Sequence, residues 1–227
     1  MTENTRRVVV TGLGIVSPVG STIDKAWANI KNGVSGIKKI SSFDASSFSV
    51  QISGSVTDFN ADDFISPKNQ KKMDTFIHYG IGASVMAIND AGLEISEENG
   101  DRVGISIGSG IGGLPYIERN YGNFLESGPR KISPFFVPSS IINMVSGNLS
   151  IMYGITGPNL SLVSACATGT HSIGDAARLI KHGYVDSMIA GGAEMATCPL
   201  GIGGFASAKA LCSSNNDDPE TASKPWD

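Results

Sequence analysis

One cysteine, set in a turn of small residues, is the side chain best placed to do chemistry. Residues 161–169 read SLVSACATG, so an apolar stretch ends in a tight turn that carries Cys166. Apolar residues then recur at intervals of three and four, which predicts a helix over 166–182. A cysteine at a helix N-terminus is favoured as the thiolate, with a pKa of roughly 3.5 to 7.5 instead of about 8.5. The pattern therefore predicts a thiol nucleophile for acyl chemistry.

The alternative interpretation of Cys166 is a small buried hydrophobic residue, which is the commonest role of a free cysteine. The strand-to-helix placement, the slim neighbours and the lack of a nearby pairing partner favour the reactive interpretation. Cys198 and Cys212 are interpreted as background. Their spacing fits neither a CxxC pair nor a zinc site, so we expect no metal and no disulfide framework.

The elements that must position this cysteine alternate between β-branched runs and helical patterns. The expected strands are 7–11, 103–107, 160–164 and 185–190, and the expected helices are 24–31, 69–91, 139–153 and 166–182. Alternation of this kind predicts parallel strands covered by helices. Segments 43–64 and 122–138 are rich in Ser, Gly, Pro and aromatic residues, and we expect them to leave the layers and cap a pocket or an interface.

Composition places the chain among ordinary globular proteins. Its 227 residues, 41% of them hydrophobic, are enough for one large domain or a part of one. The N-terminus lacks the apolar stretch of a signal peptide and no apolar run approaches 18 residues, so we expect a cytoplasmic protein without a membrane partner. A net charge of -4 without a basic stripe argues against nucleic acid.

Two glycine clusters raise the question of a nucleotide site. Residues 108–113 (GSGIGG) satisfy GxGxxG directly after an expected strand, but no acidic residue stands about 20 positions later, where a dinucleotide site needs one. The cluster at 12–14 lacks the third glycine, and neither cluster ends as a phosphate-binding loop does. We therefore interpret these glycines as positions of close backbone packing and expect no cofactor.

Together with the cysteine turn, further motifs make the chain resemble the β-ketoacyl-acyl-carrier-protein synthases, closest to the elongating type II of bacterial fatty acid synthesis. The motifs are RVVVTGLG at 7–14, GSGIGG at 108–113, PRKISPFFVP at 129–138, SACATG at 164–169, AGGAE at 190–194 and KPWD at 224–227. The resemblance runs the whole length. It implies that residues 1–227 are the N-terminal, nucleophile-bearing half of a layered α-β-α-β-α thiolase-like fold, with the C-terminal half absent, and that the protein forms a homodimer.

The resemblance also implies a two-step reaction. Cys166 takes an acyl group from acyl carrier protein, and malonyl carrier protein then loses carbon dioxide and attacks the acyl thioester. Negative charge that develops on the malonyl thioester oxygen needs preorganised donors. In this family two histidines and a lysine of the C-terminal half supply them, so we expect this chain alone not to condense. Two alternatives stay open: a non-catalytic fragment that dimerises or binds carrier protein, and a thiolase or initiating enzyme that uses acyl-coenzyme A.

The three histidines of the chain are not expected to replace the missing pair. His171 follows Cys166 by five residues, a rotation of about 140° on a helix, so its ring should point away from the thiol. His182 suits the C-terminal end of the same helix, and His78 lies beside the apolar stripe of another. All three are predicted to be structural or to face solvent.

Further site residues follow from the resemblance alone. Ile111 matches the residue that gates the acyl chain, and Phe136 matches the aromatic residue that closes the pocket from the neighbouring subunit; ordinary core packing is the alternative for both. The backbone N–H of Cys166 matches one donor to the oxyanion. Six basic residues match the surface that meets the acidic carrier protein, with simple solvation as the alternative: Lys68, Lys71, Lys72, Arg130, Lys131 and Lys209. We also expect exposed apolar surface and poor solubility.

Overall fold

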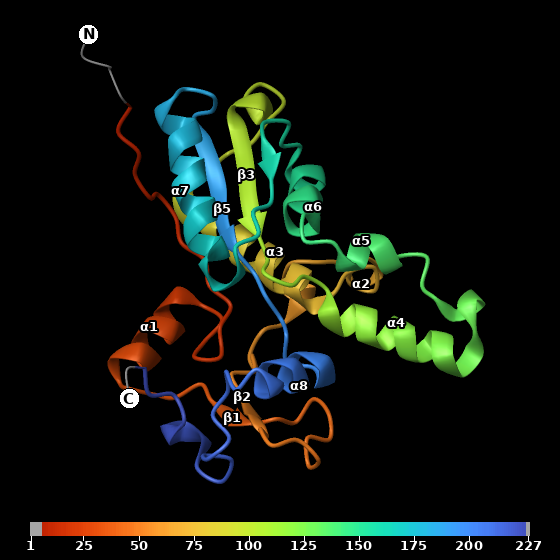
Figure 1. Cartoon of the computed structure of the whole chain (residues 1–227). Helices are drawn as coiled ribbons and strands as arrows, with labels where there is room; N and C mark the ends of the chain where they lie inside the picture. The colour runs from red at the N-terminus through yellow and green to blue at the C-terminus, as the bar shows by residue number, and fades with distance from the viewer. Residues whose placement is uncertain (1–5, 226–227) are drawn as a thin grey trace.

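The computed structural model describes residues 6–225, and a three-stranded parallel sheet of order β4-β3-β5 lies at its centre (Figure 1). The middle strand β3 (Val103–Gly108) is buried along its whole length. It pairs over six residues with β5 (Ser187–Gly192) and over two with β4 (Asn159–Leu160). The predicted parallel strands are confirmed at these three places.

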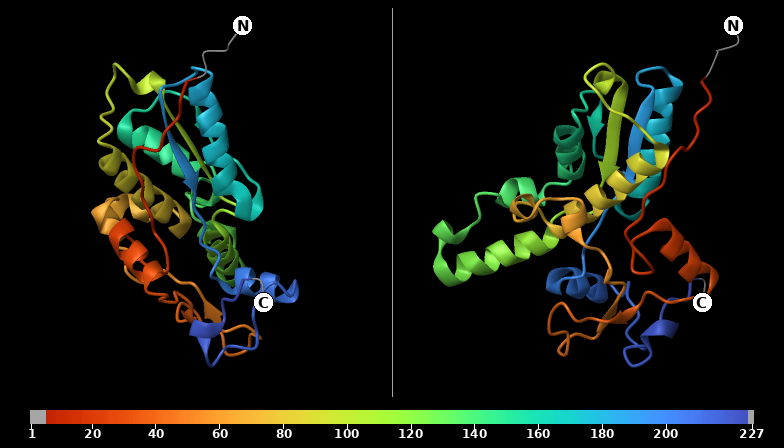
Figure 2. Two further views of the ribbon diagram at one scale, coloured as in Figure 1. Left: turned by 90° about the vertical axis from the view of Figure 1, so that its left-hand side faces the viewer. Right: turned by 180° about the vertical axis from the view of Figure 1, so that it is seen from behind.

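Helices cover both faces of this sheet (Figures 1 and 2). Helix α7 (Thr168–Lys181) lies on one face, and α3 (Thr75–Ala91) and α6 (Met144–Tyr153) lie on the other. Alternate residues of β3 point to opposite faces, so Val103, Ile105 and Ile107 enter the main core with α3 and α6. At the end of the strand, Gly108 leaves room for Thr168, the first residue of α7.

The remaining elements lie below and beside the sheet. A second, smaller core joins α8 (Pro199–Ser207) to the antiparallel hairpin of β1 (Lys38–Lys39) and β2 (Ile52–Ser53), with α1 (Ile23–Lys31) nearby. Helix α4 (Leu114–Ser127) extends away from the sheet, and the chain returns through η3 (Pro129–Lys131) and α5 (Phe136–Ser140) (Figure 2). The other short helices are α2 (Pro67–Gln70), η1 (Ala61–Asp63), η2 (Gly100–Arg102), η4 (Ala165–Ala167) and η5 (Pro219–Thr221).

Several predicted boundaries are wrong, and the largest error concerns residues 7–11, which form no strand. No strand of the described residues pairs with this segment, and the nearby N–H of Leu13 donates to the side chain of Asp90 at 2.8 Å. The strand predicted at 160–164 is only Asn159–Leu160, and the one at 185–190 is shifted to Ser187–Gly192. The last two residues of the KPWD motif, Trp226 and Asp227, lie outside the described residues.

Two predicted helices are each broken in two. The pattern at 139–153 becomes α5 and α6, and the pattern at 69–91 becomes α2 and α3. Helices α4 and α8 were not predicted. The end of α4 forms the first part of segment 122–138, which was expected to leave the layers. Segment 43–64 does leave the layers, as predicted, and Val50 and Ile52 within it line an apolar cavity.

Asp74 is the residue that separates α2 from α3. Its carboxylate accepts hydrogen bonds from the backbone N–H groups of Phe76 at 3.2 Å and Tyr116 at 2.8 Å, so it caps α3 and the first turn of α4 together. Asp74 is 3% exposed, and its burial raises the pKa of the carboxyl above its ordinary value in spite of these bonds. One buried side chain therefore caps its own helix and also bonds to the first turn of a second helix, at a residue 42 positions further along the chain.

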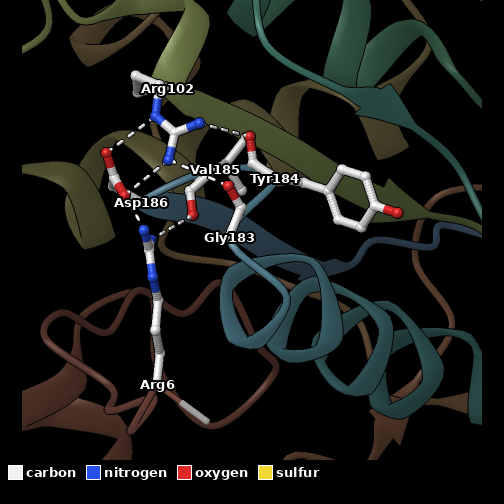
Figure 3. Close-up of polar contacts among 6 residues, drawn as sticks. All are labelled: Arg6, Arg102, Gly183, Tyr184, Val185 and Asp186. Carbon is white, nitrogen blue, oxygen red and sulfur yellow. Dashed lines mark hydrogen bonds and ion pairs between the residues drawn. The ribbon is translucent and has the colours of Figure 1, made fainter. Parts of the chain in front are cut away.

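A cluster of two arginines around one aspartate ties the beginnings of β3 and β5 to the N-terminal segment (Figure 3). Arg102 donates to both carboxylate oxygens of Asp186 at 2.9 and 3.0 Å, and Arg6 donates to one of them at 2.6 Å. Arg102 also donates to the carbonyls of Gly183 and Tyr184. The hydrogen bonds from the two guanidinium groups hold the pKa of Asp186 down to about 2.

The expected exposed apolar surface is present. Large apolar side chains are well exposed on the N-terminal segment, on α1, on α4 and on α6, where Ile151 is 80% exposed. Among residues 6–225, no helix has the length and apolar character needed to span a membrane.

Candidate active site

Cys166 lies in the turn between the end of β4 and the start of α7. The turn is a short 3-10 helix, η4, so α7 begins at Thr168, two residues later than predicted. Ala165 has a φ of +52°, a left-handed conformation that costs a residue with a side chain roughly 1–2 kcal/mol. The hydroxyl of Thr168 accepts from the N–H of Ser164 at 2.8 Å and fastens the turn. The thiol of Cys166 is exposed, which excludes the buried hydrophobic alternative in this structure.

Glycines bring the ends of β3 and β5 directly against this turn. A side-chain carbon on Gly108 would overlap the carbonyl oxygen of Leu162 and the methyl group of Thr168. One on Gly192 would lie 3.1 Å from the backbone of Gly169. Backbone atoms crowd Gly12, Gly14, Gly112 and Gly113 in the same way, so the interpretation of the clusters at 12–14 and 108–113 as close-packing positions is confirmed. The cysteine turn lies on the carboxyl ends of two parallel strands.

A carboxylate at the end of β5 holds the loop that follows β3. One oxygen of Glu194 accepts from the hydroxyl of Ser109 at 3.1 Å, and the other accepts from the N–H of Ile111 at 2.9 Å. The Ser109 hydroxyl in turn accepts from the N–H of Gly112 at 3.0 Å. The sequence interpretation gave Glu194 no role, although a carboxylate directly after a glycine-ended strand was the available signal.

Ile111 and the segment of Phe136 come together through the same loop. Ile111 is 40% exposed, and the neighbouring Gly110 is so close to Ala165 that a side-chain carbon would lie 3.3 Å from its Cα. Gly113, on the other side, is packed against the backbone of Ser140 in α5, which also begins with Phe136. Ile111 therefore lies in a loop adjacent to the nucleophile turn, and α5 backs that loop.

None of the three histidines is hydrogen-bonded to Cys166 within residues 6–225. His171 is exposed, and its Nδ1 lies 2.7 Å from the hydroxyl of Ser164. His78 lies 3.1 Å from the carbonyl of Gln70, and burial lowers its pKa. His182 is exposed at the end of α7. The exposure of His171 and His182 agrees with a solvent-facing position, but the contact of His171 with Ser164 in the nucleophile turn was not expected. The structural role of the three histidines stays a prediction.

The six predicted carrier-binding cations lie on three different elements. Lys68 is in α2, with Lys71 and Lys72 just after it, and Lys209 follows α8. Residues 114–140, which comprise α4, η3 and α5, are called the α4 arm; Arg130 and Lys131 lie in η3 at its far end (Figure 1). All are exposed except Lys72, which is partly buried. The ammonium of Lys72 lies 5.6 Å from the ring of Phe135, so α2 and the returning arm meet there.

Two of the cavities on the described surface are well defined, and neither is lined by Cys166, Ile111 or Phe136. One, of about 310 Å³, is mostly apolar and lies between β2 and α8. The other, of about 360 Å³, is lined by Lys71, His78 and Arg119 among others.

The other two cysteines differ from each other. Burial raises the pKa of Cys198 to about 11, which agrees with its interpretation as background. Cys212 lines the apolar cavity, and hydrogen bonding with Ser214 lowers its pKa. Cys212 is therefore the thiol against which the reactivity of Cys166 must be judged.

Comparison with known proteins matches residues 5–227 to the family model described as the N-terminal domain of β-ketoacyl synthase. The chain is 56% identical over 222 residues to 3-oxoacyl-(acyl-carrier-protein) synthase 2 of Vibrio harveyi, covering 98% of this chain and 53% of that protein. It is 55% identical to the enzyme of the same name from Coxiella burnetii, with the same coverage, and 44% identical to that of Staphylococcus aureus. The chain spans about half the length of the curated relatives it matches.

Solved structures agree with this assignment. A β-ketoacyl synthase from Burkholderia phymatum superposes with a TM-score of 0.85 at 29% identity, covering 98% of this chain and 54% of its own. A ketosynthase bound to a hexaketide, in complex with its type II polyketide synthase acyl carrier protein, superposes with a TM-score of 0.74 at 26% identity, covering 90% and 55%. The predicted thiolase-like fold is confirmed.

Proposed function

We propose, for a chain that belongs to the β-ketoacyl synthase family, that Cys166 accepts the acyl group of an acyl carrier protein in fatty acid elongation. The observation that carries this proposal is the exposed thiol in a left-handed turn on the carboxyl ends of β3 and β5. The names of the relatives, each a 3-oxoacyl-(acyl-carrier-protein) synthase 2, support the choice of substrate.

The first step is a thioester exchange. The sulfur of Cys166 attacks the acyl carbonyl, a new carbon–sulfur bond forms, and the bond to the carrier thiol breaks. The carrier leaves as a thiolate and takes the proton that Cys166 gave up. Oxyanion stabilisation by one backbone donor is worth about 10²- to 10³-fold in rate, and the N–H of Cys166 is the proposed donor.

The second step would be decarboxylation of malonyl carrier protein and attack of its α-carbon on the acyl thioester. That step needs donors aimed at the malonyl thioester oxygen. The family resemblance assigns them to two histidines and a lysine outside these 227 residues, and none of His78, His171 and His182 is bonded to Cys166. We therefore propose that the chain carries out acyl transfer and does not condense by itself.

The acyl chain is proposed to pass Ile111 and to be enclosed by Phe136 of a second subunit. The loop of Ile111 lies next to the nucleophile turn, which supports the first part of this proposal. The role of Phe136 from the second subunit rests on the family resemblance. Exposed apolar residues on the same arm, among them Leu125 at 64% and Val137 at 61%, support association into a homodimer. Cytoplasmic location stays a prediction.

The carrier protein is proposed to dock on the basic residues of α2, η3 and the end of α8. A neighbour solved in complex with its own acyl carrier protein supports this kind of partner. Cations that solvate freely contribute little to stability, but opposed charges across an interface raise the rate of encounter. Lys68 lies in the first part of this surface, Arg130 in the second and Lys209 in the third.

The experiment is to mix the protein with acyl carrier protein that bears a long or short acyl group and to measure the carrier thiol that is released. Wild-type protein and Cys212→Ala should release one carrier per chain, and Cys166→Ala should release none. Added malonyl carrier protein should yield no β-ketoacyl product. Binding of carrier without release would instead favour the non-catalytic fragment, and equal release by Cys166→Ala would contradict the proposal.

A further inference from the structure

The loop that carries Ile111 is fixed by a single carboxylate from another element. Glu194 lies just beyond β5 and accepts from the Ser109 hydroxyl with one oxygen and from the Ile111 N–H with the other. Ser109 is 1% exposed, and its hydroxyl also accepts from the N–H of Gly112. Glu194 and Ser109 therefore hold the N–H groups of two consecutive residues, Ile111 and Gly112. Removing Glu194 would leave the buried Ser109 hydroxyl without its acceptor.

The same carboxylate holds the loop against the nucleophile turn. A side-chain carbon on Gly110 would lie 3.1 Å from a Glu194 oxygen and 3.3 Å from the Cα of Ala165, so the loop fills the space between the two. Gly112, with a φ of +83°, turns the chain back toward the backbone of Ser140. Ala165 adjoins Cys166, so a shift of Glu194 would move this loop relative to the nucleophile turn.

We infer that Glu194 is a positioning residue that sets where the Ile111 backbone stands relative to Cys166, and so decides which chains reach the thiol. This inference rests on the proposed role of Ile111. With the backbone fixed by Glu194, the Ile111 side chain turns aside for an acyl chain while the loop stays in place. Without the carboxylate, the whole loop is free to move into the space beside the thiol. The displaced loop then obstructs long chains, whereas short chains still reach Cys166.

A merely structural role for Glu194 makes a different prediction. If Glu194 only stabilised the end of β5, its loss would lower stability and change the reactivity of Cys166 toward large and small reagents alike. A positioning role changes the ratio of the two reactivities. Glu194→Gln keeps one acceptor oxygen and should restore part of the wild-type ratio, because only one of the two donors then loses its partner.

The test uses N-ethylmaleimide and N-dodecylmaleimide on the full chain in a Cys212→Ser background, with the alkylation of Cys166 followed by mass spectrometry. These reagents need no carrier protein, so the outcome stands whether or not the proposed acyl transfer is observed. Glu194→Ala should lower the ratio of dodecyl to ethyl rates by about tenfold. Glu194→Gln should fall between, and Glu126→Ala, an exposed carboxylate on α4, should leave the ratio unchanged.

Amide hydrogen exchange of a peptide spanning 109–113 gives the second readout. Glu194→Ala should speed exchange of this peptide by about tenfold, since the Ile111 N–H loses a charged acceptor. Equal changes in both maleimide rates, or unchanged exchange in Glu194→Ala, would overturn the inference.

Discussion

Small side chains decide how closely the nucleophile approaches the sheet. Gly108 and Gly192 end their strands without side chains, and Ala165 accepts a left-handed conformation beside Cys166. Any larger residue at the two glycines would push the turn away from the strand ends. The position of the thiol therefore depends on the absence of side chains at Gly108 and Gly192. Glu194 and Thr168 supply the polar contacts that fix the surrounding loop and turn.

Replacement of Ile111 by phenylalanine should discriminate between acyl chains. The larger ring fills space beside the turn, and overpacking typically costs about 1–3 kcal/mol, or roughly tenfold to hundredfold in rate. Acylation of Cys166 by a long-chain carrier donor should fall by this factor while a short-chain donor reacts nearly as before. Initial rates with the two donors measure it, and an equal loss at both lengths would contradict the proposed gate.

At the scale of elements, Asp74 makes α3 and α4 depend on one another. Both of its oxygens accept from helix N-termini, so Asp74→Asn, which turns one oxygen into an N–H₂ group, must leave one donor facing another. We expect Asp74→Asn to lower the free energy of unfolding by about 1–3 kcal/mol. Urea unfolding measures this change.

The matched control for Asp74 is Thr22, which caps α1 alone through Lys25. Thr22→Ala should cost about 1 kcal/mol. If Asp74→Asn proved no more destabilising than this single-helix cap, the joint capping of α3 and α4 would be of no consequence for stability.

The elements most accurately predicted from the sequence were those specified by local pattern. Strand β3 and helix α7 were placed to within two residues, because β-branched alternation and helical periodicity are both local signals. The break between α2 and α3 was missed because the second partner of Asp74 lies in α4. Helix α4 was not predicted, although Pro115 lies in its first turn, where proline is well suited.

The candidate site was predicted unevenly for the same physical reason. The Cys166 turn could be located from its own residues, since small neighbours and the following helix are contiguous in sequence. The roles of Ile111 and Phe136 came only from the family resemblance. Glu194 escaped notice because its partners, Ser109 and Ile111, are about eighty positions away in the chain.

At the scale of the whole molecule, the Arg6–Arg102–Asp186 cluster makes stability depend on acid pH (Figure 3). The pKa of Asp186 falls from an ordinary 3.8 to about 2 in the folded protein. The folded state thus binds this proton less readily than the unfolded state, so the stabilisation is complete above the ordinary pKa and is lost as pH falls through about 2.

Asp186→Asn should therefore lower the melting temperature at neutral pH and flatten its decline in acid. Melting temperatures of both proteins across the acid range measure the difference. Asp217→Asn is the control, because Asp217 is fully exposed and, within residues 6–225, forms an ion pair with Lys39 alone. Parallel acid profiles for wild type and Asp186→Asn would show that protonation of Asp186 does not contribute to the loss of stability in acid.

The distribution of positive charge should govern the encounter with carrier protein. Reversing Arg130 and Lys131 to glutamate at the end of the α4 arm should slow association by about tenfold at low ionic strength, and less at high salt. The control reverses Lys38 and Lys39 on the distant hairpin, which gives the same net charge. Association rates measured by stopped flow that fall equally for both variants would assign the effect to net charge alone.

The most direct test of the nucleophile is to map the acyl group after reaction with acyl carrier protein. Peptide mass spectrometry can distinguish Cys166 from buried Cys198 and from Cys212, whose pKa is lowered by Ser214. We predict that the acyl group is found on Cys166 alone, at one group per chain. An acyl group on Cys212, or none on folded protein, would contradict Cys166 as the acyl acceptor.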